Sequence, residues 1–94
     1  METFPALELL EAMHSFPCVF TFKVIGKADN DFPSRILTAI QSELDHPEVP
    51  KHSIRETKQG RHVSLTVEPM VQSSYHVLAI YRKIQTVEGL VMLL

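Results

Sequence analysis

The residue types and spacing best suited to holding a ligand are those of Lys23, Arg55, His62 and Ser64. Side chains along a strand point alternately to opposite faces, and each of these four lies out of phase with its apolar neighbours. Cationic groups beside a hydroxyl can hold a small anion through charge-assisted hydrogen bonds. We therefore expect these residues to form the binding surface for a small anionic ligand. A solvated sheet face would have the same composition, so that interpretation stays open.

Residues suited to catalysis or metal binding do not form a recognisable constellation. Cys18 has no base beside it in the sequence, and a nucleophile needs one. Residues 29–31 resemble the start of an EF-hand loop, but the sixth position would be Ser34 and the twelfth Ile40, where the loop needs glycine and glutamate. No two histidines have the i, i+4 spacing of a helical zinc site; they are His14, His46, His52, His62 and His76. We expect no enzyme activity, no metal and no cofactor.

The elements that must position these residues follow from the periodicity of apolar side chains. Phe20, Phe22 and Val24 alternate with other residues, which predicts a strand over residues 18–25 that Gly26 ends. The other predicted elements are a short helix over residues 5–13 capped by Thr3, helices over 32–45 and 75–85, and strands over 52–58, 61–68 and 90–94.

Local signals define the ends of these elements. Asp31 can cap the helix over residues 32–45, and Ser73 or Ser74 can cap the helix over 75–85. The dipeptide Gln59-Gly60 suits a two-residue turn between the second and third strands. That turn places Ile54 opposite Leu65, so that an apolar side chain meets an apolar side chain across the pair.

The order of helix, then strand-helix-strand-strand-helix-strand predicts an α+β fold of the ferredoxin-like type. Right-handed crossovers give a four-stranded antiparallel sheet in the order 4-1-3-2, with two helices on one face. Residues 1–94 would form one such domain, with residues 4–14 as an N-terminal helical extension. The RNA-recognition motif shares this topology but stacks bases on exposed aromatic side chains of its central strands. Phe20 and Phe22 fall on the core face instead, so RNA binding is the weakest alternative.

The composition argues for a folded protein that is not held on nucleic acid mainly by charge. The 94 residues contain nine basic and eleven acidic side chains, a formal net charge of −2, whereas nucleic-acid binding rests on clustered lysine and arginine. No apolar run is long enough for a membrane span, and the first residues lack the basic and apolar regions of a secretory signal. The single cysteine, Cys18, fits a reducing compartment, so we expect a cytoplasmic location.

The last predicted strand suggests a different function. Residues 90–94 are apolar on both faces, and an exposed edge strand of this kind invites pairing with another chain. The N-terminal helix has its own apolar stripe, formed by Ala6, Leu9, Leu10 and Met13. These surfaces could cover each other, dock a protein partner or join two copies in a homodimer. A protein-interaction adaptor is therefore the alternative to a ligand-binding module.

Several segments resemble the YbeD-like family of small bacterial proteins. The resemblance is carried by Phe16-Pro17, by FTFKVIG at 20–26, by Ser53, by KQGRHVSLTV at 58–67 and by VMLL at 91–94. It implies a ferredoxin-like fold similar to the ACT regulatory domain, which binds small effectors, and it implies no established reaction. The chain departs from the pattern at Val91, where members often carry a basic residue, and residues 45–50 carry no part of the match. Together with the polar sheet face, the resemblance favours a non-enzymatic ACT-like ligand-binding or regulatory module.

Overall fold

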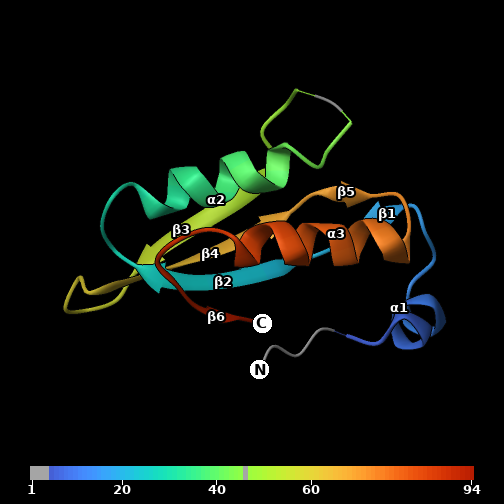
Figure 1. Cartoon of the computed structure of the whole chain (residues 1–94), viewed down its shortest axis with the longest axis horizontal. Helices are drawn as coiled ribbons and strands as arrows, with labels where there is room; N and C mark the ends of the chain where they lie inside the picture. Colours follow the sequence, from blue (N-terminus) through green and yellow to red (C-terminus); the bar gives the residue numbers. More distant parts are fainter. Residues whose placement is uncertain (1–4, 46) are drawn as a thin grey trace.

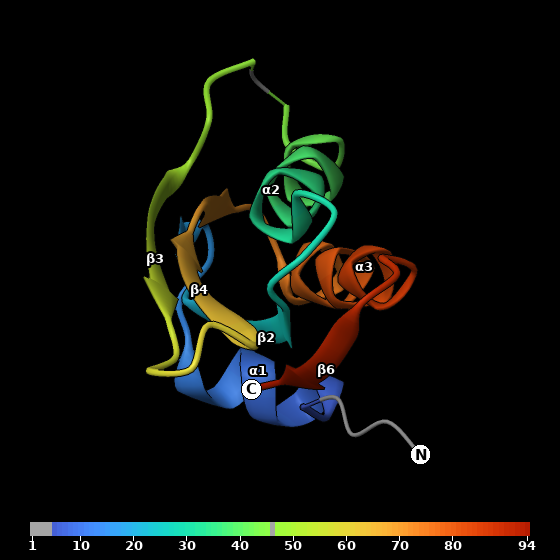
Figure 2. The ribbon, with the colours of Figure 1, turned by 90° about the vertical axis from the view of Figure 1, so that its left-hand side faces the viewer.

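A four-stranded antiparallel sheet carries two helices on one face (Figures 1 and 2). The computed structural model describes residues 5–45 and 47–94. The strand order is β3-β4-β2-β6, with β2 at Phe22–Lys27, β3 at Lys51–Glu56, β4 at His62–Glu68 and β6 at Leu90–Leu93. The covering helices are α2 (Phe32–Gln41) and α3 (Ser74–Gln85). When the four strands of this sheet are counted from 1 to 4 along the chain, the order read from β6 is 4-1-3-2, as predicted. The ferredoxin-like α+β fold is therefore confirmed.

The core lies between this sheet and its two helices. Along β4, Val63, Leu65 and Val67 are buried and alternate with half-buried polar residues. Along β2, Phe22 and Val24 are buried on the same side of the sheet. The helices contribute the buried residues Phe32, Ile36, Ile40, Val77, Ile80 and Ile84. The predicted inward faces of the two central strands are therefore confirmed.

An aromatic cluster fills the part of the core that lies against α3. The ring centroid of Phe22 is 4.9 Å from that of Phe20 and 5.0 Å from that of Tyr81. Phe20 is 8% exposed and Phe22 is fully buried. Tilted and edge-to-face ring contacts of this kind add to the free energy gained from burial. Both phenylalanines therefore belong to the core, as their alternation predicts, and neither is displayed on the open face for stacking.

Residues 18–25 do not form one continuous strand, so this prediction is wrong. The chain first forms β1 (Cys18–Val19), which pairs with β5 (Met70–Val71) in a separate two-stranded sheet, and only then enters β2. Between the two sheets, the Phe20 N–H donates a hydrogen bond to the Pro69 carbonyl at 3.0 Å. This division depends on a segment far along the chain, and local alternation contains no information about it.

Gly26 does not end β2, because the strand continues to Lys27. The ring of Phe32, the first residue of α2, lies where a side chain on Gly26 would stand. A Cβ at that position would come within 2.2 Å of Phe32 Cζ. Glycine is therefore required by the close approach of the ring to the strand, and not by a turn.

The hairpin between β3 and β4 has the predicted register and a longer loop than predicted. Ile54 lies opposite Leu65, as expected. The two-residue turn is wrong, because the Thr57 N–H donates to the His62 carbonyl at 3.0 Å and closes a loop of four intervening residues. Gly60 takes the expected positive φ, at 68°, and its N–H donates to the Thr57 carbonyl at 2.9 Å.

The two covering helices begin close to the predicted positions but are capped differently. Ser73 Oγ accepts a hydrogen bond from the His76 N–H at 3.1 Å, which confirms this serine as the cap of α3. Asp31 occupies the N-cap position of α2, yet its side chain makes no capping hydrogen bond. Helix α2 also ends at Gln41, a few residues earlier than predicted. Thr3, the expected cap of the first helix, lies outside the described residues.

The N-terminal helix α1 (Leu7–Met13) packs against the start of α3 (Figure 1). Leu10 is the buried residue of α1. The Ser74 hydroxyl donates to Glu11 Oε2 at 3.0 Å and ties the two helices together. The predicted apolar stripe of α1 is therefore only partly covered. Its exposed members include Leu9, at 56%, and Met13, at 73%.

Candidate functional site

Three of the four residues predicted to bind a ligand line one depression on the open face of the sheet. It has a volume of about 290 Å³. The central strand β4 runs through it: Ser64 lies opposite Arg55 of β3, and Thr66 lies opposite both Lys23 of β2 and Ser53 of β3. We call this depression the open-face hollow. Its polar lining residues are Lys23, Ser53, Arg55, Ser64 and Thr66.

His62, the fourth predicted residue, lies outside the open-face hollow. It is opposite Lys27 at the hairpin end of β4, one side-chain step beyond Ser64 on the same face. It is also half-buried, whereas Lys23 and Arg55 are exposed. His62 therefore lies beside the open-face hollow on the same face and is not part of its lining.

The open-face hollow is locally basic. Lys23 and Arg55 are exposed, and neither forms an ion pair within the described parts of the chain. Lys51 and Glu68, at a neighbouring position of the same ladder, lie 4.0 Å apart at their charged ends. Lys27 adds a further cation on this face. A surface with unpaired cations attracts anions even in a protein with a small negative net charge.

Three hydroxyl groups of the open-face hollow are available to a ligand. Those of Ser53 and Thr66 make no hydrogen bond with residues 5–45 or 47–94, whereas the Ser64 hydroxyl donates to the Arg55 carbonyl at a long 3.5 Å. A bond of that length contributes little and is easily exchanged for a better acceptor. The hollow therefore offers positive charge together with neutral hydrogen-bonding groups.

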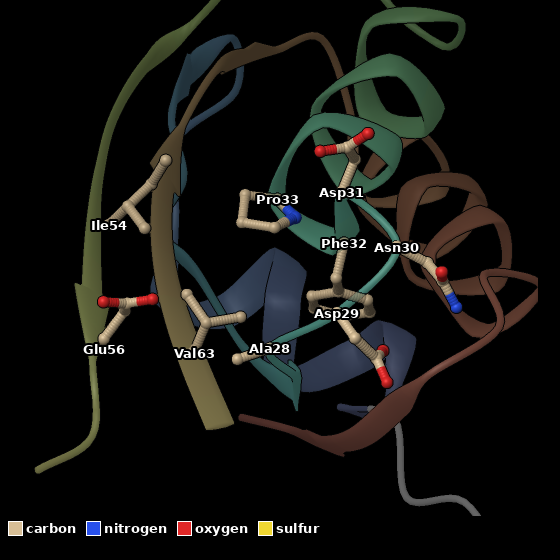
Figure 3. Close-up of a pocket in the computed structure, with 9 residues that line it drawn as sticks. All are labelled: Ala28, Asp29, Asn30, Asp31, Phe32, Pro33, Ile54, Glu56 and Val63. Atoms are coloured by element: carbon tan, nitrogen blue, oxygen red, sulfur yellow. The ribbon is translucent and has the colours of Figure 1, made fainter. Parts of the chain in front are cut away.

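A larger cleft opens on the helix side of the sheet, between the start of α2 and the edge strand β3 (Figure 3). Its volume is about 600 Å³. Ile54 and Glu56 project from β3 toward the loop that carries Asp29 and Asp31. None of the three carboxylates forms an ion pair within the described residues. The lining residues are Ala28, Asp29, Asn30, Asp31, Phe32, Pro33, Ile54, Glu56 and Val63. Because this cleft is acidic, it is the less favourable of the two hollows for an anion.

This cleft was not predicted, because Asp31 was interpreted only as a helix cap and residues 29–31 only as a failed EF-hand loop. Asn30 and Asp31 have φ values of 52° and 55°, a left-handed conformation that these two residue types tolerate better than most. An Asn-Asp pair directly before a helix is the signal that could have revealed the tight loop. The width of the cleft depends on how far β3 stands from α2, which no local pattern gives.

Arg35 fixes the loop beside the cleft. Its Nε donates to the Asn30 carbonyl at 2.8 Å, and its Nη1 donates to the Glu88 carbonyl at 2.7 Å. Its guanidinium carbon also lies 5.7 Å from the centre of the Phe32 ring. These contacts join the loop before α2 to the loop before β6. The guanidinium is therefore occupied by main-chain carbonyls of the protein itself.

Residues 5–45 and 47–94 contain neither a metal-binding cluster nor a membrane-spanning helix. No group of three or more His, Cys, Asp or Glu side chains in these ranges could hold a metal ion. None of the described helices is both long and apolar enough to cross a membrane.

Among the histidines, His76 accepts a hydrogen bond at Nδ1 from the Gln72 N–H at 3.0 Å, so its Nε2–H donates to the Glu43 carbonyl at 2.7 Å. This imidazole has a structural role between α2 and α3.

Apolar side chains are exposed along β6 as well as on α1. Val91 and Met92 are about half exposed, at 50% and 49%, and Leu94 is more so. The Leu94 N–H donates to the Lys23 carbonyl at 2.8 Å, which keeps the end of the chain against β2. Met92 lies opposite Ile25 and therefore borders the open face.

The chain matches known proteins along most of its length. The family described as protein of unknown function (DUF493) matches residues 11–94. A UPF0250 protein of Idiomarina loihiensis is 32% identical over 73 residues, which are 78% of this chain and 81% of that protein. A UPF0250 protein of Shewanella oneidensis is 29% identical over 82 residues, covering 87% and 86% respectively. The solution structure of protein HP0495 from H. pylori shares the fold, with a TM-score of 0.65 at 16% identity over 100% of this chain and 98% of that one.

Proposed function

Because the chain belongs to the DUF493 family, which confirms the YbeD-like resemblance but supplies no known activity, we propose a function from the molecule's own geometry. The protein is a non-enzymatic, ACT-like module that binds a small anionic ligand on its open sheet face and acts in regulation. The observation that carries this proposal is the open-face hollow, in which two unpaired cations flank a row of hydroxyl groups.

The composition of the hollow favours binding over catalysis. Its lining contains ammonium, guanidinium and hydroxyl groups, but no imidazole, thiol or carboxylate. Cationic hydrogen-bond donors can hold a carboxylate or phosphate group, and the guanidinium can do so with two parallel bonds. The lining has no imidazole or carboxylate that could activate a serine or threonine hydroxyl as a nucleophile. A ligand would therefore be bound and released without being changed.

Ligand screening tests the proposal. The melting temperature of the protein would be measured with nucleotides, amino acids and small carboxylic acids, and the most stabilising compound would be titrated by calorimetry. We expect Lys23→Gln and Arg55→Gln each to weaken binding by about tenfold or more, because a hydrogen bond to a charged group contributes roughly 1.5–3 kcal/mol. Mixed single-stranded RNA would be titrated in parallel, since it is the weakest alternative.

Two control variants locate the effect. Arg82→Gln removes the same charge from an exposed position on α3, in the helix layer. His62→Gln alters the open face just outside the hollow. Both should bind the ligand as the wild type does. If no compound raises the melting temperature, or if Arg82→Gln weakens binding as much as Arg55→Gln, the proposed site is wrong.

A second candidate function, the protein-interaction adaptor, is supported by the apolar side chains exposed on β6 and α1. Met92 and Met13 would form part of its docking surface. Affinity capture from a bacterial lysate would compare the wild type with Met13→Lys and Met92→Lys. A specific partner that both substitutions release supports the adaptor, whereas capture that is unaffected by them argues against it.

A further inference from the structure

The sheet has two edge strands that differ in how well they could accept another strand. Strand β6 has four residues, and its pairing with β2 shifts register beside Gly26. Short and irregular edges discourage further pairing. Strand β3 has six residues in unbroken register with β4, and all six are exposed. Figure 2 shows β3 on the outer side of the sheet, and β4 is its one neighbour among the described strands. The regular, open edge is therefore β3.

Alternate main-chain groups of β3 point away from the sheet. At the end of its ladder with β4, the Thr57 N–H donates to the His62 carbonyl. Because hydrogen bonds alternate along an antiparallel pair, the odd-numbered residues of β3 bond to β4. The N–H and carbonyl groups of His52, Ile54 and Glu56 then point to the free edge. A further antiparallel strand could bond to β3 through these three residues.

We propose that this further strand is β3 of a second copy of the chain, paired antiparallel about a two-fold axis through Ile54. The axis stands normal to the sheet, so the two sheets join into one continuous sheet. The helices of both copies then lie on the same side, and so do the two open faces. This association requires no ligand and is independent of the proposed function.

The sequence of β3 favours this register over the two adjacent ones. Residues that face each other across the two β3 strands must have side chains on the same side of the sheet. Odd-numbered residues therefore lie opposite odd-numbered ones, and a two-fold axis normal to the sheet must pass through a residue and not between two residues. An axis through Ser53 would put Lys51 opposite Arg55. An axis through Arg55 would put two guanidinium groups opposite each other. Like charges directly opposite are destabilising, and the axis through Ile54 avoids both cases.

The axis through Ile54 also places complementary groups opposite one another. Ile54, which is 49% exposed, meets its own copy, and His52 meets Glu56 of the second copy. His52 Nδ1 lies 2.8 Å from the Pro50 carbonyl, so that contact takes the Nδ1–H and leaves Nε2 of the imidazolium form for the carboxylate. Glu56 has no ion-pair partner within the described residues. Opposite charges and apolar pairs directly across a ladder are stabilising.

The same pairing would alter both hollows. On the open face, Arg55 of one copy lies opposite Ser53 of the other. Since both residues line the open-face hollow, the second copy adds a guanidinium to its rim. On the helix side, Ile54 and Glu56 line the acidic cleft, so the clefts of the two copies adjoin across the seam.

Sedimentation velocity at concentrations from about 10 µM to about 1 mM tests the association, because small interfaces bind weakly. We expect a concentration-dependent dimer. Ile54→Lys puts two like charges at the axis and should raise the dissociation constant by about tenfold or more. Met92→Lys is the matched control, because Met92 is also 49% exposed and lies on the other edge strand. It should leave the dimer unchanged. Circular dichroism would verify that both variants are folded.

A charge exchange tests the register itself. His52→Glu opposes two carboxylates, and Glu56→Lys replaces the carboxylate that faces His52 with an ammonium group, so each variant alone should associate about tenfold or more weakly than the wild type. In an equimolar mixture of the two variants, each altered residue meets an opposite charge in the heterodimer. The mixture should therefore recover association close to that of the wild type.

Three outcomes would overturn the proposal. The first is a wild-type chain that stays monomeric over the whole concentration range. The second is a dimer that Met92→Lys disrupts as strongly as Ile54→Lys, which would remove the assignment to β3. The third is a mixture of the two charge variants that associates no better than either alone, which would contradict the register. If either charge variant fails to fold, the comparison of Ile54→Lys with Met92→Lys still decides the assignment.

Discussion

At the scale of single residues, neighbours on β2 have opposite environments. Phe22 is fully buried within the aromatic cluster, whereas Lys23 is exposed on the open face. The main-chain direction of a strand enforces this separation, because successive side chains leave it on opposite sides. Substitutions at adjacent positions should therefore affect different properties of the protein.

Phe22→Ala should lower the free energy of unfolding by about 3–5 kcal/mol, because it removes a buried ring and leaves a cavity. Chemical denaturation monitored by circular dichroism would measure this change. Tyr75→Ala is the control, since Tyr75 is 66% exposed and its loss should change stability little. A Phe22→Ala protein of normal stability that had merely lost ligand binding would show that this residue is not a core residue.

Tyr81 gives the protein a dependence on alkaline pH. Burial raises the pKa of its hydroxyl above the usual value of 10.0. As the pH rises past 10.0, a tyrosine in the unfolded chain loses its proton before Tyr81 does in the folded protein. The stabilising contribution is therefore complete below that pH and is lost as the pH rises through the raised pKa.

Unfolding free energies from about pH 8 to about pH 11 would reveal this contribution. We expect stability to fall less steeply with alkaline pH in Tyr81→Phe than in the wild type. Tyr75→Phe should follow the wild-type curve, because Tyr75 is largely exposed. Identical slopes for the wild type and Tyr81→Phe would mean that burial of this hydroxyl does not govern the alkaline limit.

At the scale of elements, the junction of β2 with α2 depends on one close approach. The Phe32 ring is fully buried and lies directly over Gly26, so it cannot swing aside to admit a side chain. Helix α2 can begin at this point only because the strand beneath it has no Cβ there. The position of the helix therefore constrains the residue type within the strand.

Gly26→Ala should cost about 1–3 kcal/mol through overpacking against Phe32. In a Phe32→Leu background the same substitution should cost less, because the smaller side chain leaves room, and a double-mutant cycle would measure that coupling. Gly60→Ala is the contrasting case. Gly60 has a φ of 68° and no atom within 4 Å of its added Cβ, so its cost is one of backbone strain and should not depend on residue 32. A Gly26→Ala penalty that is the same in both backgrounds would contradict the packing argument.

Elements were predictable where one side of a segment is buried and the other is not. Alternation along β4 gave its inward face. The Gln59-Gly60 signal gave its register with β3, because a slip by one residue would have placed Ile54 opposite a polar residue. The division between β1 and β2 was not predictable, since it depends on pairing with Met70–Val71. The same alternation placed Lys23, Arg55 and Ser64 on the open face, where they line one hollow. The acidic cleft was missed because its width depends on the distance between α2 and β3.

At the scale of the whole molecule, Arg35 joins parts of the chain that are far apart in sequence. Its hydrogen bonds to the Asn30 and Glu88 carbonyls connect the loop entering α2 with the loop entering β6. These loops belong to opposite halves of the chain, so this side chain helps to fix their relative positions at this end of the sheet, together with the hydrogen bond from the Lys27 N–H to the Gly89 carbonyl. The acidic cleft lies beside the same end.

Arg35→Lys should loosen this end of the molecule, because lysine keeps the charge but cannot donate in two fixed directions. Amide hydrogen exchange should become faster in residues 28–31 and around Gly89, and global stability should fall by about 1 kcal/mol. Arg82→Lys, on the exposed surface of α3, should leave both unchanged. Unaltered exchange in the two loops would show that the Arg35 hydrogen bonds do not hold them together.

The two-residue period of β2 and β4 also bears on how this scaffold can diversify. Open-face positions such as Lys23 and Ser64 interleave with packing positions such as Phe22 and Leu65, yet the two sets point to opposite sides. A mutation in the first set changes the chemistry of the open face without disturbing the second. The open face could therefore diverge among relatives on an unchanged framework, and an engineer could rewrite it one position at a time.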